Sequence, residues 1–106
     1  MKLITKEIQK KLPNLYAMES EDPSNVKVPL KLFNPCGAAT WFITEMDPET
    51  GVMFGWCDLG MGMPELGYVN LDELKSVRLP FGLKIERDIH WNPNTTLAQV
   101  MSGEKS

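Results

Sequence analysis

The sequence predicts an α+β domain with a mostly antiparallel sheet of four or five strands, an N-terminal amphipathic helix on one face and a second short helix at an end. Three observations lead to this prediction. Residues 40–57 have the pattern of a β-hairpin, further segments alternate apolar and polar residues as strands do, and two short segments combine helical spacing with capping residues.

The hairpin is the strongest of these patterns. Two apolar runs flank the turn at residues 47–51, in which Pro48 presets φ, Asp47 can cap the turn and Gly51 can take the positive φ that closes it. Simple alternation predicts two faces, one with Trp41, Ile43 and Glu45 and the other with Phe42, Thr44 and Met46. Because both faces are largely apolar, we expect the N-terminal helix on one and either the C-terminal segment or a contact surface on the other.

The N-terminal half supplies one helix and one strand. Residues 5–12 form a predicted helix that Thr5 caps and Pro13 ends, with Ile4, Ile8 and Leu12 on its inner side. Residues 17–25 are predicted to be an acidic loop. Residues 26–33 alternate as a strand does, with Pro29 favouring the strand's start or a sheet edge.

The C-terminal half adds a glycine-rich loop at 58–64 and a strand at 65–69. Asn70 and Glu73 then have the spacing of a capping box for a helix over 70–77. Residues 80–82 break that helix, and residues 83–91 alternate as a last strand. We expect residues 1–92 to form a single domain and residues 93–106 to be a polar, mobile tail.

Length and composition limit the function classes. A chain of 106 residues suits one domain, and a formal charge of −3 lacks the basic excess of a general nucleic-acid binder. Without an apolar run of membrane-spanning or signal-peptide type, we expect a cytoplasmic protein. Cys36 and Cys57 are expected to be unpaired there. No cofactor motif is found, since the sequence lacks a phosphate-binding loop, G-x-S-x-G and C-x-x-C.

The chain also resembles a family of small bacterial proteins of unknown function that are carried on plasmids and integrative elements. The resemblance covers almost all of the chain up to about residue 92, and its matching segments are KLITKEIQKKLPNLY at 2–16, WFITEMD at 41–47, FGW at 54–56, ELGY at 65–68, DEL at 72–74 and FGLKIERD at 81–88. The chain departs from the family pattern at Lys84, where proline is common, and near Ala39, where a second aromatic residue is common. The resemblance implies a mobile-element context and no particular chemistry.

Carboxylates at strand ends are the most chemically suggestive feature. Residues two apart on a strand share a face, so Glu45 with Asp47, or Glu86 with Asp88, could bind Mg²⁺ or Mn²⁺ or act as an acid and a base. The alternative is a structural role, in which Asp47 is a turn residue and Glu45, Arg87 and Glu86 form a cross-strand ion-pair ladder. Arg87, which lies between two acids, would supply the counter-charge.

Aromatic and methionine side chains provide two binding hypotheses. Trp41, Trp56 and Tyr68 lie on adjacent predicted strands, where exposed rings could stack single-stranded bases. The alternative is that these rings belong to the core, which is the more common role of aromatic residues on strands. Met61 and Met63 lie on a glycine-rich loop and suit a protein-contact patch.

The function we favour from the sequence is a non-enzymatic accessory protein of a mobile element that binds a protein partner, such as a host factor. A carboxylate-based enzyme and a single-stranded nucleic-acid binder are the alternatives. The oligomeric state is left open.

Overall fold

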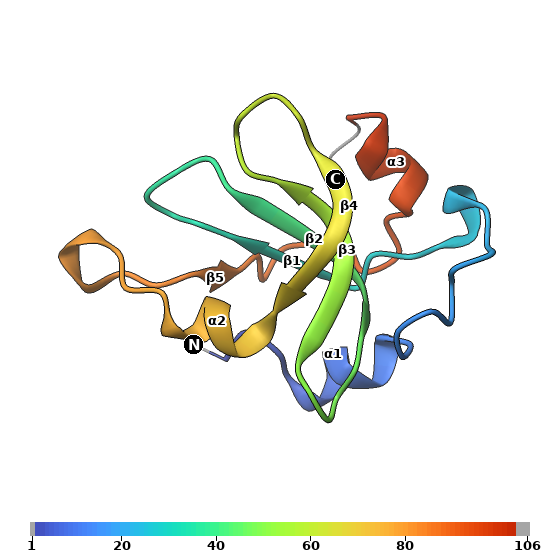
Figure 1. The fold of residues 1–106 in the computed structure, drawn as a ribbon, viewed down its shortest axis with the longest axis horizontal. Helices are drawn as coiled ribbons and strands as arrows, with labels where there is room; N and C mark the ends of the chain where they lie inside the picture. The colour runs from blue at the N-terminus through green and yellow to red at the C-terminus, as the bar shows by residue number, and fades with distance from the viewer. Residues whose placement is uncertain (1, 104–106) are drawn as a thin grey trace.

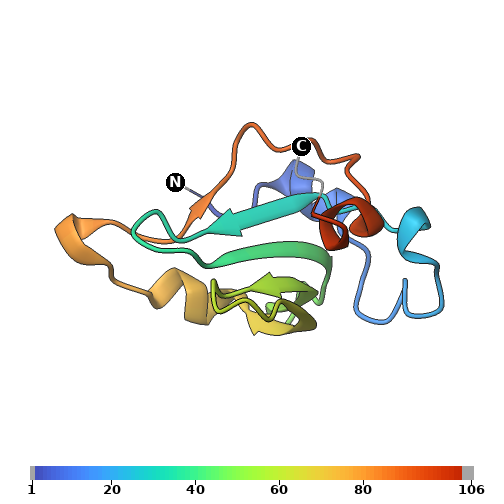
Figure 2. The ribbon, with the colours of Figure 1, turned by 90° about the horizontal axis from the view of Figure 1, so that it is seen from above.

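A computed structural model describes residues 2–103 and confirms the α+β class (Figure 1). The helices are α1 (Lys6–Lys11), η1 (Pro23–Asn25), α2 (Leu71–Ser76), η2 (Pro80–Gly82) and α3 (Leu97–Met101), and the strands are β1 (Leu30–Phe33), β2 (Thr40–Met46), β3 (Val52–Asp58), β4 (Glu65–Asn70) and β5 (Glu86–Arg87). The five strands form one antiparallel sheet in the order β4-β3-β2-β1-β5. Figure 2 shows this order from above, with β5 and β1 on one side and β4 on the other.

The β2–β3 hairpin has the turn that the sequence predicts. Gly51 takes a φ of +78°, and its N–H donates to the carbonyl of Asp47 at 2.9 Å. The Asp47 carboxylate accepts from the N–H of Glu49 at 2.9 Å. Gly51 therefore closes the turn and Asp47 caps it, as predicted for these two residues.

A β-bulge in β2 corrects the predicted faces of the hairpin. The pairing register with β3 shifts between Ile43 and Glu45, so one extra residue stands in β2 there. That residue moves the alternation by one position. As a result Glu45 lies on the same face as Thr44, and Met46 joins Ile43 in the core on the other face.

The first core lies between one sheet face and the helices α1 and α2. As predicted, Thr5 caps α1 and accepts from the N–H of Ile8, and Ile4, Ile8 and Leu12 pack on the sheet. Asn70 caps α2 by accepting from the N–H of Asp72, so the predicted capping box with Glu73 is not formed, and Leu74 is buried. The buried members of this core are Leu3, Leu12, Leu30, Leu32, Trp41, Ile43, Met46, Met53, Leu74 and Ile85.

The second core lies on the opposite face and includes the C-terminal segment. Its buried members are Val26, Val28, Phe42, Trp91, Leu97 and Val100. The helix α3 begins with a capping box between Thr96 and Gln99 and lies beside η1, as Figures 1 and 2 both show. This differs from the expected mobile tail over 93–106. Burial of two α3 side chains holds the segment on the sheet, while residues 104–106 lie outside the described chain.

Two predicted strands are shorter than expected. The ladder of β1 starts only at Leu30, after the proline that cannot donate a hydrogen bond. The residues before it pair with the C-terminal segment instead, because the N–H of Val28 donates to Thr95 and the N–H of Leu97 donates to Val26. Of the predicted last strand at 83–91, only β5 is formed, and it pairs with β1.

Candidate functional site

The candidate site is a cavity of about 340 Å³ on the second face of the sheet. Its floor consists of Thr44 and Glu45 from β2 and Phe54 from β3, and its outer wall consists of Leu66 and Tyr68 from β4. The segment 16–26 and Leu97 of α3 close the other side. The second core thus covers only part of this sheet face, and the cavity occupies the rest.

Glu45 is the chemically distinctive residue of the cavity. Its side chain is only 4% exposed, and its Oε2 accepts a hydrogen bond from the N–H of Met18 at 3.0 Å. None of the described residues that line the cavity is basic, whereas Glu19 and Glu21 add two more carboxylates. A buried carboxylate is normally neutralised by a cation or a dense set of donors. Here the described chain provides one donor and no cation.

Two tyrosines and a phenylalanine surround this carboxylate. The rings of Phe54 and Tyr68 meet at a centroid distance of 5.0 Å and an angle of 57°. The pKa of the Tyr68 hydroxyl is raised, first by its hydrogen bond with the Tyr16 side chain, then by burial and by the nearby charges of Glu19 and Glu45. A phenol is protonated at neutral pH, and this shift extends the pH range over which Tyr68 remains a hydrogen-bond donor.

The strand β4 beside the cavity is an edge strand of the sheet. Next to it, the N–H of Leu71 donates to the carbonyl of Gly51, which lies directly opposite in the β3–β4 register. Hydrogen-bonded and non-hydrogen-bonded pairs alternate in an antiparallel ladder. The main-chain groups of Gly67 consequently face β3, and those of Leu66 and Tyr68 face the outer edge.

The loop that connects β3 to β4 continues this exposed surface. Leu59, Met61 and Met63 are all exposed on it. Gly60 has a φ of +81° and approaches the neighbouring loop so closely that an added Cβ would lie 2.4 Å from the Cβ of Ala38. The loop is thus held at its base, while both of its methionines are exposed to solvent.

The four predicted carboxylates are not brought together. Asp47 caps the hairpin turn, Asp88 forms an ion pair with Lys31 at 3.4 Å, and Glu86 lies on β5. Because β1 separates β5 from β2, the pairs do not converge as the catalytic hypothesis requires. Among residues 2–103, no group of three or more histidine, cysteine or acidic side chains could hold a metal ion.

The ion-pair ladder with Glu45 is not formed either. Glu45 faces the cavity, two strands away from Arg87, and the guanidinium of Arg87 donates to the carbonyl of Lys2. The ladder hypothesis needed Glu45 on the predicted face of β2, and the bulge turns it to the other.

The aromatic residues are only partly available for contact. Trp41 is 9% exposed and belongs to the first core, and Trp56 is half-buried against the second. Tyr68 is 56% exposed and is the predicted aromatic contact residue that the surface displays most fully. The aromatic platform that base stacking would need is therefore interrupted, because Trp41 is buried in the first core and Trp56 packs partly against the second.

Sequence reasoning missed the residues that close the cavity. Tyr16, Glu19 and Glu21 lie in a segment without periodicity, and only the three-dimensional contact between Met18 and Glu45 shows their role. The α3 residue Leu97 had a detectable signal, since Thr96 and Gln99 have capping-box spacing.

No helix of the described residues is long and apolar enough to span a bilayer.

Comparisons with known proteins identify the family of this chain. No curated protein and no solved structure matches the chain. A family model described as "Protein of unknown function (DUF2958)" matches residues 3–104, almost the full length. The chain therefore belongs to the DUF2958 family of proteins of unknown function.

Proposed function

We propose that this protein is a non-enzymatic accessory protein of a mobile genetic element that acts by binding a protein partner, with a host factor as the expected class of partner. The observation that carries the proposal is the surface formed by the open edge of β4, the cavity beside it and the exposed β3–β4 loop. We call this surface the β4 surface, and it includes the exposed side chains of Tyr16, Met61, Met63, Leu66 and Tyr68. The resemblance to plasmid and integrative-element proteins supports the mobile-element part of the proposal.

The composition of the β4 surface suits protein contact. Tyr16, Leu66 and Tyr68 are exposed large apolar or aromatic side chains beside a cavity, and tyrosine is among the residues that contribute most to protein interfaces. Met61 and Met63 extend the surface with flexible apolar groups. The outward main-chain groups of β4 can also accept an added strand.

Affinity capture from bacterial lysate tests the proposal. The tagged wild-type protein is compared with Leu66→Ala and Tyr68→Ala, which alter the β4 surface, in the presence and absence of nuclease. The matched control is Phe81→Ala, which removes a fully exposed aromatic side chain from η2, outside the β4 surface. Circular dichroism verifies that each variant is folded.

We expect a stoichiometric partner that survives nuclease, is retained by Phe81→Ala and is lost or weakened by both β4 variants. A partner set that disappears with nuclease would instead support nucleic-acid binding. Capture of no partner, or equal capture by the β4 variants, would contradict the proposal.

A further inference from the structure

Building on the proposed function, we infer that the cavity is a specificity pocket for a cationic side chain, lysine or arginine, of the protein partner. Its ammonium or guanidinium group would lie against the carboxylate of Glu45, and its alkyl stem would lie along the adjoining rings of Phe54 and Tyr68. The partner must then present a cationic side chain, a requirement that the β4 surface alone does not impose.

The carboxylate of Glu45 has one oxygen available to a ligand. Oε2 accepts from Met18, whereas Oε1 forms no hydrogen bond with the described residues. No fully buried side-chain oxygen or nitrogen of residues 2–103 lacks a hydrogen-bond partner, so Oε1 is not fully buried. Because Glu45 lines the cavity and its side chain is otherwise enclosed, Oε1 is open toward the cavity.

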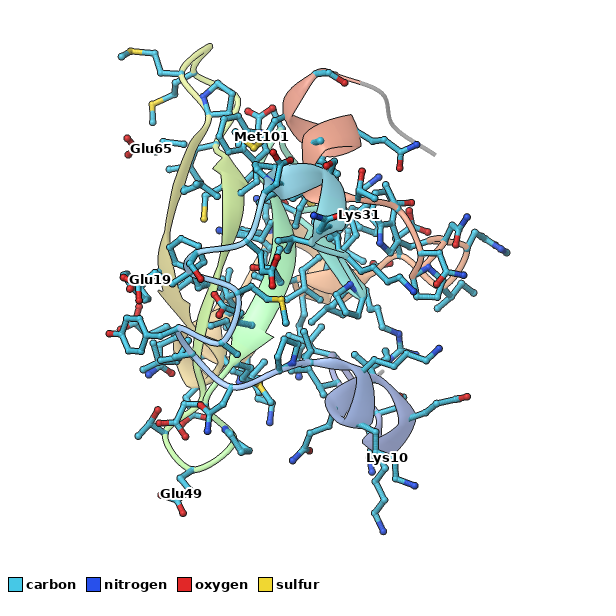
Figure 3. The ribbon with its side chains drawn as sticks, turned by 90° about the vertical axis from the view of Figure 1, so that its right-hand side faces the viewer. Lys10, Glu19, Lys31, Glu49, Glu65 and Met101 are labelled. Atoms are coloured by element: carbon cyan, nitrogen blue, oxygen red, sulfur yellow. The ribbon has the colours of Figure 1, made fainter. Side chains whose placement is uncertain are left out.

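The acidic lining of the cavity favours a positively charged ligand. Glu19, Glu21 and Glu45 line it, and the described lining includes no lysine, arginine or histidine. In Figure 3, Glu19 and Glu65 lie on the side of β4, whereas Lys10 and Lys31 lie away from them. A cation entering the cavity would gain a charge-assisted hydrogen bond in a partly desolvated position.

The size and walls of the cavity suit a side chain. A volume of about 340 Å³ is at the low end for pockets that hold small molecules, and it has room for one long side chain. Aromatic faces attract cations as well as alkyl stems, and Phe54 and Tyr68 present two adjacent rings. An anionic or purely apolar side chain would leave Glu45 without a counter-charge.

The test uses small probes and does not need the natural partner. N-acetyl-lysine methylamide and N-acetyl-arginine methylamide are titrated into the ¹⁵N-labelled protein at low salt, with N-acetyl-norleucine methylamide as the uncharged control. The amide of Met18 is the direct reporter, because it donates to Glu45. The same titrations are repeated with Glu45→Gln and with the matched control Glu49→Gln, an exposed carboxylate at the hairpin turn (Figure 3).

We expect the lysine and arginine probes to bind about tenfold more tightly than norleucine and to shift the Met18 amide. Glu45→Gln keeps an oxygen that can accept from Met18, and it should lower the affinity for both cations about tenfold, whereas Glu49→Gln should leave it unchanged. Equal binding of lysine and norleucine probes, or unaltered binding to Glu45→Gln, would overturn the inference. If Glu45→Gln fails to fold, comparing the lysine and norleucine probes on the wild-type protein still tests whether the cavity prefers a cation.

The two proposals fail in different ways. If a partner is captured through the β4 surface but the cavity shows no preference for cations, the proposed function is supported and this inference is wrong. If the cationic probes bind but no partner is captured, the cavity binds cations and the proposed function is contradicted.

Discussion

Gly55 gives the most direct test of the described sheet. An added Cβ at this position would lie 2.0 Å from the carbonyl oxygen of Phe42 and 2.9 Å from the Cα of Ile43, both main-chain atoms of β2. Since real Cβ contacts are not found below 3.0 Å, the Gly55→Ala variant requires a main-chain movement of about 1 Å beside the bulge. We expect a loss of about 3 kcal/mol or more, which is the upper end for overpacking.

The matched control lies directly opposite on the next strand. Gly67 pairs with Gly55 in the β3–β4 register, and an added Cβ there meets no atom within 4 Å. Gly67→Ala should therefore leave stability unchanged or raise it by about 0.4–1 kcal/mol through the unfolded chain. Urea unfolding and thermal melting measure both variants, and a loss of about 3 kcal/mol corresponds to a fall in Tm of about 12–24 °C. Similar stabilities for the two alanine variants would refute the bulged pairing of β2 with β3.

Three further expectations concern other parts of the chain. Gly51→Val should lower the free energy of unfolding by about 1–3 kcal/mol, because a β-branched residue at a φ of +78° is strained. Phe81→Asn should raise Tm, since Phe81 has a φ of +63° and is 97% exposed, and asparagine tolerates this conformation better. Cys57 should react with a thiol reagent more slowly than the exposed Cys36, because burial and then the charge of Glu65 raise its pKa, and Glu65→Gln should accelerate it.

Each of these expectations has a contradicting result. An unchanged Tm for Gly51→Val would show that the turn does not need a left-handed residue. A lower Tm for Phe81→Asn would mean that the phenyl ring stabilises the fold. Equal reaction rates for the two cysteines would contradict the half-buried position of Cys57.

Local chemistry explains the elements that the sequence predicted well. The turn at Asp47 and Gly51 depends on the properties of those residues alone, and so do the caps of α1 and α2 at Thr5 and Asn70. The α+β class followed from these elements. Their apolar residues then had to be buried against one sheet, whatever the details of its order.

Non-local contacts explain what the sequence did not predict. A helix of five residues such as α3 is held by burial of Leu97 and Val100, so its weak local signal was easily missed. The position of β5 beyond β1 cannot be derived from a two-residue strand. The cavity arises where the segment 16–26 meets β2, and Tyr16 takes a φ of +69° there without a glycine to indicate it.

The bulge in β2 also gives the cavity two consecutive residues, Thr44 and Glu45, where a regular strand would give it one. Glu45 can change with the chemistry of a ligand, while Met46, one position later, faces the opposite side and keeps its place in the first core. In a regular strand, a residue facing the cavity at position 45 would instead require position 44 to face the first core. Family members could therefore diversify what they recognise at position 45 without repacking the core beneath α1 and α2.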